Sequence, residues 1–193
     1  GGIKGRIEAT GRGVCEALKE FFRHPEEVSK ANINNPNLDG QKIIIQGFGN
    51  VGSNSAKTLF ATGAKIVGIA EKDGAIFNKK GINIIELEKY KQDKNTILGF
   101  PNTEKIDTSS DLLTYDCDIL IPAALENAIT LKNVNKIKAK IICEAANGPV
   151  SYRADQKLKD RGAVIIPDIY ANAGGVTVSY FEWIRKISHI RMG

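Results

Sequence analysis

The chain has few of the residues that build disulfide frameworks and metal centres. Its 193 residues include three cysteines and two histidines. The cysteines, Cys15, Cys117 and Cys143, are far apart in the sequence and form no C-x-x-C pair. Such an odd, scattered set predicts buried free thiols in a reducing compartment, not a disulfide framework or a zinc site. With only His24 and His189 available, we expect neither a histidine-rich metal site nor a histidine-dependent catalytic triad.

Long hydrophobic runs and blocks of one charge are also missing. No apolar stretch approaches the roughly 20 residues of a membrane-spanning helix, so we expect no membrane span. Lysine and arginine number 27 against 22 aspartate and glutamate, a net charge of +5 that is spread along the chain. Since no basic run is interleaved with aromatic residues, nucleic acid is not an expected partner. The chain starts at Gly1 without a methionine, so we expect a piece of a longer protein.

What is present is typical of a globular α/β domain, with 42% hydrophobic and 25% charged residues. Apolar runs and periodicities predict strands at 42–46, 65–70, 75–78, 118–121, 140–143 and 163–166, and helices at 13–23, 53–62, 83–94, 130–137, 151–161 and 176–188. Segments 24–40 and 95–110 are interpreted as irregular. Strands that alternate with helices predict βαβ units. The expected fold is a doubly wound, mostly parallel Rossmann-type sheet with helices on both faces.

The sequence G-x-G-x-x-G, at residues 47–52, directly follows the strand predicted at 42–46. It runs into a predicted helix, and the next predicted strand leads to Glu71, about 20 residues beyond the motif. A carboxylate at that distance is placed to accept a hydrogen bond from a ribose hydroxyl. The context therefore predicts a dinucleotide site, with a glycine-rich turn that binds no ligand as the alternative.

Each glycine of the motif has its own expected role. Gly47 allows a tight turn after the strand, Gly49 lets the backbone approach a pyrophosphate, and Gly52 lets the helix pack close to the sheet. The backbone N–H groups of Asn50 and Val51, at the start of the helix, are expected to face the phosphates. Asn50 alternatively serves only as a helix cap.

The residues after the second strand bear on the choice of coenzyme. Glu71 favours NAD, because a carboxylate binds the ribose 2′-hydroxyl and repels a 2′-phosphate. Lys72 offsets part of that repulsion, so NADP stays open as the coenzyme. Asp73 is assigned to the Asp73-Gly74 turn.

Two further strands end in small or polar residues, at 122–124 and 144–147. The carboxyl ends of parallel strands share one edge of a sheet, so these segments are expected beside the glycine motif. Asn147 there either contacts the nicotinamide or its ribose, or only forms a turn. Asn172 similarly offers helix-start donors to an anion or a carboxamide, or is a plain cap. No serine or cysteine has a partner base in a recognisable motif, and no lysine stands out as catalytic.

Several segments resemble glutamate dehydrogenase in their order and spacing. They are residues 1–6, 9–13, 46–52, 119–124 and 172–183, and together the resemblance covers essentially the whole chain. The last of them, NAGGVTVSYFEW, is long and highly specific. Residues 97–101 and 146–149 are similar to the animal-type hexameric branch, which is usually mitochondrial.

The resemblance implies oxidative deamination of L-glutamate to 2-oxoglutarate and ammonia, with hydride transfer to NAD or NADP. It implies cofactor contacts for Thr10, Gly47, Gly49, Asn50, Val51, Glu71, Lys72, Ala123, Ala124, Asn147 and Asn172, and substrate contacts for Val176 and Ser179. The catalytic lysine and aspartate of the family lie in an N-terminal substrate domain, which we expect outside this chain. Residues 1–193 are then one coenzyme-binding domain, inactive alone, of a homohexamer in the mitochondrial matrix, or otherwise in the cytoplasm.

Two rival functions stay open beside this one. The first is a related leucine-, valine- or phenylalanine-type dehydrogenase, against which Ser179 argues, because an apolar substrate side chain favours an apolar contact. The second is a non-catalytic dinucleotide-binding regulatory module, which the fold alone permits.

Overall fold

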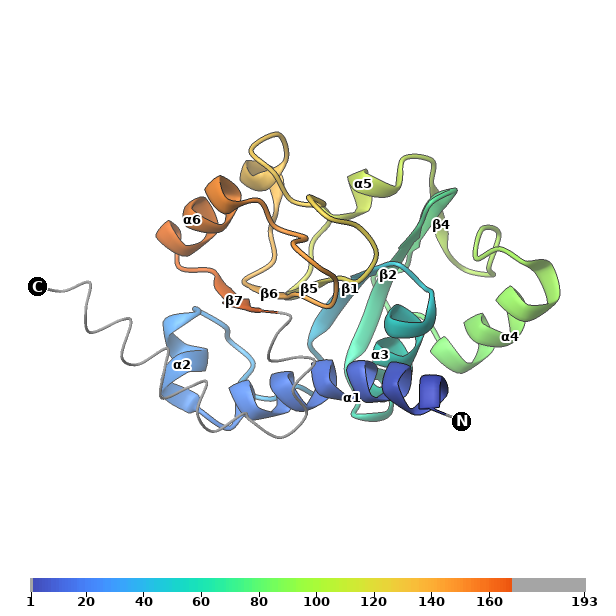
Figure 1. The fold of residues 1–193 in the computed structure, drawn as a ribbon, viewed down its shortest axis with the longest axis horizontal. Coiled ribbons are helices and arrows are strands. Elements are labelled where there is room, and N and C mark those ends of the chain that lie inside the picture. The colour runs from blue at the N-terminus through green and yellow to red at the C-terminus, as the bar shows by residue number, and fades with distance from the viewer. Residues whose placement is uncertain (1, 168–193) are drawn as a thin grey trace, which may run out of the picture.

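The computed structural model describes the backbone of residues 2–167 and the side chains of residues 11–167. Its centre is a seven-stranded sheet in the order β4-β3-β2-β1-β5-β6-β7 (Figure 1). The strands are β1 (Lys42–Gln46), β2 (Lys65–Glu71), β3 (Gly74–Phe77), β4 (Glu104–Ile106), β5 (Ile119–Pro122), β6 (Ile141–Cys143) and β7 (Val164–Ile166). The strands β2, β1, β5, β6 and β7 are parallel to one another. At one edge β3 pairs antiparallel with β2, and β4 pairs antiparallel with β3. The predicted α/β, mostly parallel sheet is confirmed.

Helices cover both faces of this sheet (Figure 1). They are α1 (Gly2–Phe22), α2 (Pro25–Lys30), α3 (Asn50–Ala61), α4 (Ile84–Lys94), α5 (Ser109–Leu112) and α6 (Tyr152–Asp160), with a 3₁₀ turn at Val134–Lys136. Side chains alternate along β1: Ile43 and Ile45 join the core formed with α1, α3 and α4, whereas Ile44 joins the core formed with α5 and α6. A strand buried on both faces explains the continuous apolar run in the sequence.

Two corrections concern the N-terminal part of the chain. The helix expected from residue 13 begins at Gly2, so the glycine-rich start is helical. Gly11 shows why glycine is present there: a Cβ on it would lie 2.6 Å from the Cβ of Asn54 on α3, so α1 can approach α3 only without a side chain at this position. Tertiary packing thus overrides helix propensity. The expected loop 24–40 contains α2, because Pro25 stands at the first helical position, where proline is tolerated.

Two further corrections lie in the second half. Segment 95–110 contains β4 and the start of α5, because residues 104–106 pair with β3. The helix expected at 130–137 is only the 3₁₀ turn. Asn133 disfavours a longer helix there, since its side chain accepts the Thr130 N–H and donates to the Ala128 carbonyl. The helix expected at 176–188 lies outside the described residues.

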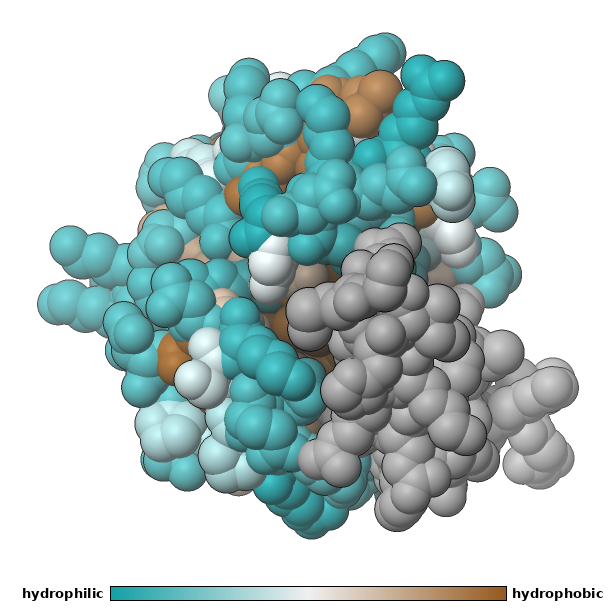
Figure 2. Space-filling view, turned by 90° about the vertical axis from the view of Figure 1, so that its left-hand side faces the viewer, coloured by the Kyte–Doolittle hydropathy of each residue, from teal (hydrophilic) through white to brown (hydrophobic). Residues whose placement is uncertain are grey.

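The side of the molecule with α2 and α6, at the left of Figure 1, faces the viewer in Figure 2 and is largely hydrophilic, with hydrophobic residues in small separate patches. Across residues 2–167 no helix combines the length and hydropathy needed to cross a bilayer. All three cysteines are buried free thiols, as predicted.

Candidate functional site

The carboxyl ends of four neighbouring parallel strands form one rim of the sheet. Hydrogen bonds continue the ladder beyond the strands. The Gly47 N–H donates to the Ala70 carbonyl at 2.7 Å, and the Ala123 N–H donates to the Gln46 carbonyl at 2.8 Å. The Ala145 N–H reaches the Pro122 carbonyl in the same way, at 3.0 Å. The turns after β1, β5 and β6 are therefore held side by side, as the sequence predicts.

The glycines of the motif occupy three different environments. Gly47 has φ +95°, and a Cβ there would lie 2.8 Å from the Cβ of Ala124. A Cβ on Gly52 would lie 1.9 Å from the Gly47 carbonyl oxygen, so the first turn of α3 is pressed onto the glycine turn. A Cβ on Gly49 would meet nothing within 4 Å. Two glycines thus permit close packing, and the third leaves the backbone open to a ligand.

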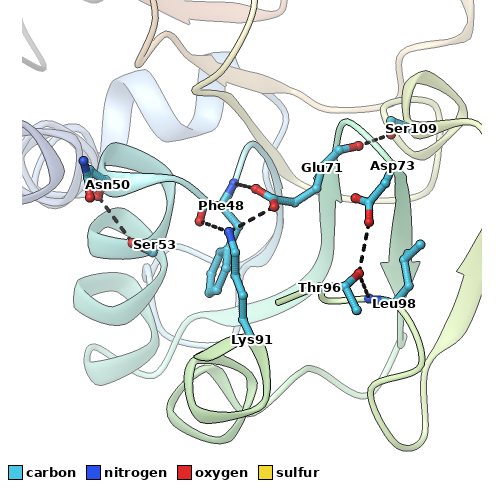
Figure 3. Close-up of polar contacts among 9 residues, drawn as sticks. All are labelled: Phe48, Asn50, Ser53, Glu71, Asp73, Lys91, Thr96, Leu98 and Ser109. Carbon is cyan, nitrogen blue, oxygen red and sulfur yellow. Dashed lines mark hydrogen bonds and ion pairs between the residues drawn. The ribbon is translucent and has the colours of Figure 1, made fainter. Parts of the chain in front are cut away.

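The helix α3 begins one residue earlier than it would if Asn50 were its cap. Gly49 is the cap residue and Asn50 is the first residue of the helix, so the alternative that Asn50 caps it is wrong. The Asn50 carbonyl accepts a hydrogen bond from Asn54 Nδ2 at 2.8 Å. It also accepts one from Ser53 Oγ at 3.4 Å (Figure 3). The N–H groups of Asn50 and Val51, in the first helical turn, have no acceptor within the helix; Asn50 is exposed and Val51 is half-buried. This helix start can receive an anion.

Glu71 ends β2 and turns its side chain to the glycine turn. Its Oε1 accepts the Phe48 N–H at 2.7 Å, and its Oε2 lies 3.0 Å from Nζ of Lys91 (Figure 3). Lys91 also donates to the Phe48 carbonyl at 2.8 Å, and its ammonium lies 5.4 Å from the centroid of the Phe48 ring. Both carboxylate oxygens therefore have partners in the protein, and the negative charge has a counter-charge.

Lys91 is a residue of this rim that sequence reasoning missed. It lies on α4, about 20 residues after Glu71, within a helix whose existence and Asn83 cap were predicted. A signal was present: Ile84, Leu87 and Lys91 follow the spacing of one helical face, and the first two are fully buried. A lysine that continues a buried stripe approaches the core with its stem and uses its ammonium at the edge.

Other predicted residues lie around the same rim. Ala123 is half-buried, whereas Ala124, Lys72 and Asn147 are exposed. Asn147 stands in the turn after β6, where Gly148 has φ +51° and its carbonyl accepts the Asn127 N–H at 2.9 Å.

Asp73 accepts a hydrogen bond from the Thr96 hydroxyl at 3.0 Å, away from the glycine turn (Figure 3). This position agrees with its assignment to the turn after β2. Thr10 lies in α1, and its side chain is outside the described part. Asn172, Val176 and Ser179 lie outside the described residues altogether.

Two features of this rim are those that a bound ligand needs. A hollow of about 310 Å³ borders the glycine turn and α4 and is lined by Phe48, Gly49, Asn50, Ser53, Glu88, Lys91, Gln92 and Asn95. At the end of β1, the side-chain oxygen Oε1 of buried Gln46 has no hydrogen-bond partner among the described residues. Buried polar atoms are normally paired, so an unpaired one at the rim is consistent with a ligand donor.

Cys143, at the end of β6, supplies no nucleophile, because burial raises the pKa of its thiol and keeps it protonated.

Comparison with known proteins adds family information to this geometry. The family model described as Glutamate/Leucine/Phenylalanine/Valine dehydrogenase matches residues 1–192. The mitochondrial glutamate dehydrogenase of Dictyostelium discoideum is 52% identical over the whole chain, which spans 38% of that protein. The NADP-specific glutamate dehydrogenase of Saccharolobus shibatae is 45% identical over 97% of this chain and 42% of its own length.

Solved structures agree with the sequence comparisons. A glutamate dehydrogenase from Peptoniphilus asaccharolyticus superposes with a TM-score of 0.67 at 37% identity, over 96% of this chain and 40% of that one. The hetero-hexameric glutamate dehydrogenase from Thermus thermophilus reaches a TM-score of 0.73 at 21% identity, over 95% of this chain and 41% of that one, and shows the shared fold alone. The chain thus spans about two fifths of the length of these proteins.

Proposed function

The chain belongs to the Glutamate/Leucine/Phenylalanine/Valine dehydrogenase family, and we propose that it supplies the coenzyme-binding part of a glutamate dehydrogenase. In the proposed reaction, L-glutamate loses a hydride from Cα, and water replaces the amino group to give 2-oxoglutarate and ammonia, reversibly. The proposal is supported by relatives described as glutamate dehydrogenases, such as those that are 52% and 45% identical over all or nearly all of the chain. The observation that carries it is the open backbone at Gly49 between two crowded glycines at the end of β1.

The proposed coenzyme contacts follow the rim from one strand to the next. The backbone around Gly49, Asn50 and Val51 holds the pyrophosphate, because unpaired N–H groups and the positive end of the helix dipole favour anions. Glu71 takes the adenosine ribose, and Ala123 and Ala124 give a flat wall of small side chains. Thr10, Asn147 and Asn172 are assigned to the nicotinamide end, and Val176 and Ser179 to the substrate, by resemblance to the family.

When bound, NAD or NADP accepts the hydride from glutamate. The share of this chain in catalysis is to fix the coenzyme, so that the transfer becomes a positioned and nearly unimolecular step. Proton transfer belongs to parts of the enzyme outside residues 1–193 in this proposal.

Glu71 and Lys91 together suggest how the coenzyme is chosen. A lone carboxylate at the ribose repels a 2′-phosphate, which carries close to two negative charges. Here Nζ of Lys91 lies 3.0 Å from Oε2 of Glu71 and neutralises the charge of that carboxylate. The Lys91 ammonium can instead pair with a 2′-phosphate when one is bound. We therefore propose that both NAD and NADP are accepted, with Glu71 serving the first and Lys91 the second.

Two finer assignments also belong to the proposal. A mitochondrial location is supported by the name of the Dictyostelium discoideum relative at 52% identity. A homohexamer is supported by the resemblance to the hexameric branch.

The test is the binding of NADH and NADPH, measured by fluorescence, to the wild-type protein and to Glu71→Ala. We expect both coenzymes to bind the wild type and Glu71→Ala to lose mainly NADH affinity, by about 1–2 kcal/mol for lost hydrogen bonds to a charged group. Failure of both to bind the folded wild-type protein contradicts the proposal. Turnover of glutamate but not leucine, valine or phenylalanine by the full-length protein separates the proposed enzyme from its relatives, and absence of any turnover favours the regulatory module.

A further inference from the structure

A second hollow lies at the opposite edge of the sheet, where β1 and β2 begin. Its volume is about 590 Å³, within the range of small-molecule sites. It is lined by Lys42, Lys65, Val67, Phe77, Lys79, Lys80 and Asp116, and we call it the four-lysine hollow. The five-residue strand β1 runs from this hollow to the glycine turn, a span of about 13 Å at roughly 3.3 Å per residue. The two sites are therefore distinct.

The charges around the four-lysine hollow are unbalanced. The ammonium of Lys42 pairs with Asp116, and this contact raises the pKa of the lysine and lowers the pKa of the carboxyl. Among residues 11–167, Lys65, Lys79 and Lys80 form no ion pair. Three unpaired ammonium groups on one hollow repel one another, and an anion bound among them relieves the repulsion.

The backbone beneath these lysines is held in place by hydrogen bonds. The Asn78 N–H donates to the Val67 carbonyl at 2.8 Å, and the Lys80 N–H donates to Oδ1 of Asn78 at 2.9 Å. The stem of Lys65 lies along the same turn, because a Cβ on Gly81 would be 3.0 Å from its Cγ. The turn that carries Lys79 and Lys80 is therefore fixed relative to the start of β2, which carries Lys65.

The floor of the hollow is apolar. Val67 is fully buried, and the half-buried ring of Phe77 packs edge-on against Tyr115, with ring centroids 4.9 Å apart. Cationic walls over an apolar floor lower the local screening by water, so each charge interaction is stronger than on an open surface. Lysine binds phosphate groups as a compact point charge, without the fork geometry that planar carboxylates favour.

We propose that the four-lysine hollow binds a compact polyphosphate, either free or as the polyphosphate group of a small molecule. Its phosphates pair with Lys65, Lys79 and Lys80, and Lys42 with Asp116 closes one side. A chain of phosphates offers more anionic oxygens to the three free ammonium groups than a single orthophosphate does, so the hollow is proposed to favour the chain. This site is independent of the dinucleotide site at the other edge of the sheet.

The first test is calorimetric titration of the protein with tripolyphosphate at fixed ionic strength, with orthophosphate in parallel. We expect tripolyphosphate to bind at least tenfold more tightly than orthophosphate. The double variant Lys65→Gln with Lys79→Gln is expected to lose at least tenfold in affinity. The matched control removes the same charge elsewhere: Lys136→Gln with Lys157→Gln, both exposed and unpaired among the described residues, should change affinity less than twofold.

The second test locates the ligand without any substitution. Brief acetylation of the protein, followed by mass spectrometry, reports the reactivity of each lysine. Tripolyphosphate should protect Lys65, Lys79 and Lys80 and leave Lys136 and Lys157 reactive, with or without saturating NADH.

Three results overturn the proposal: no tripolyphosphate binding, equal losses in the two double variants, or protection absent from the hollow. Displacement of tripolyphosphate by NADH with the three lysines unprotected assigns the anion to the glycine turn instead. If the Lys65→Gln and Lys79→Gln variant does not fold, the protection pattern of the wild-type protein decides alone.

Discussion

Nζ of Lys91 lies 3.0 Å from Oε2 of Glu71, and the other oxygen of this carboxylate accepts the N–H of Phe48. One ion pair thus joins the end of β2, the glycine turn and α4. The acid that the sequence assigns to the coenzyme ribose carries its own counter-charge, and this has consequences for both coenzyme choice and stability.

The first prediction concerns coenzyme choice. Lys91→Met keeps most of the apolar stem but removes the charge, so Glu71 faces a 2′-phosphate without compensation. The loss of a charge-assisted pair is worth about 1.5–3 kcal/mol, so we expect NADPH affinity to fall at least tenfold. NADH affinity should change less than threefold. Fluorescence titration with both coenzymes measures the ratio.

The control for this variant is Lys94→Met, which removes an exposed lysine from the same helix and should leave the ratio unchanged. Equal losses for NADH and NADPH in Lys91→Met would show that Lys91 only supports the fold of the glycine turn.

The second prediction concerns stability without coenzyme. Glu71→Ala leaves the Phe48 N–H without its acceptor and the Lys91 ammonium without its counter-charge, in a partly buried place. We expect a loss of about 1–3 kcal/mol in the free energy of unfolding, measured by urea denaturation. Glu71→Gln should cost less, because its amide oxygen can still accept the Phe48 N–H. Equal stability of Glu71→Ala and wild type contradicts a structural role for the pair.

The third prediction separates two glycines of one motif. Gly52→Ala places a methyl group 1.9 Å from the Gly47 carbonyl oxygen, so the glycine turn must move, and we expect a loss of about 2–4 kcal/mol in unfolding free energy. Gly49→Ala meets no atom within 4 Å and has an ordinary φ of −77°, so the fold should keep its stability. Its methyl group stands where the pyrophosphate is proposed, so coenzyme affinity should fall at least tenfold. A Gly49→Ala protein with unchanged affinity places the pyrophosphate elsewhere.

Local signals in the sequence predict much of this rim. The strand and the glycine turn follow from residue pattern alone, because each glycine has a backbone reason for its position. The helix after them is also predicted, although α3 begins at Asn50 and not at the expected residue 53. The cap at Asn83 is confirmed as well, since its side chain accepts the Glu86 N–H at 3.1 Å.

What the sequence leaves open depends on tertiary placement. Lys91 gains its partners only because α4 packs beside the glycine turn, and no local pattern specifies that distance. Gly11 likewise sits inside a helix because α3 comes within contact of it, and propensity alone predicts the opposite. Residues 104–106 become a strand by pairing with β3, although their own pattern is too short to indicate one.

The last prediction concerns the three thiols. Burial raises the pKa of Cys15, Cys117 and Cys143, so the reactive thiolate is scarcer at pH 8 than for an exposed cysteine. We expect the native protein to react with Ellman's reagent slowly, at a rate set by unfolding, and three thiols to react at once in denaturant. Because opening of the core and not ionisation limits this rate, increasing the pH from 7 to 9 should accelerate the native reaction much less than that of free cysteine. Rapid reaction of one thiol in the native protein would contradict this prediction, because it would show that the thiol becomes exposed without unfolding of the core.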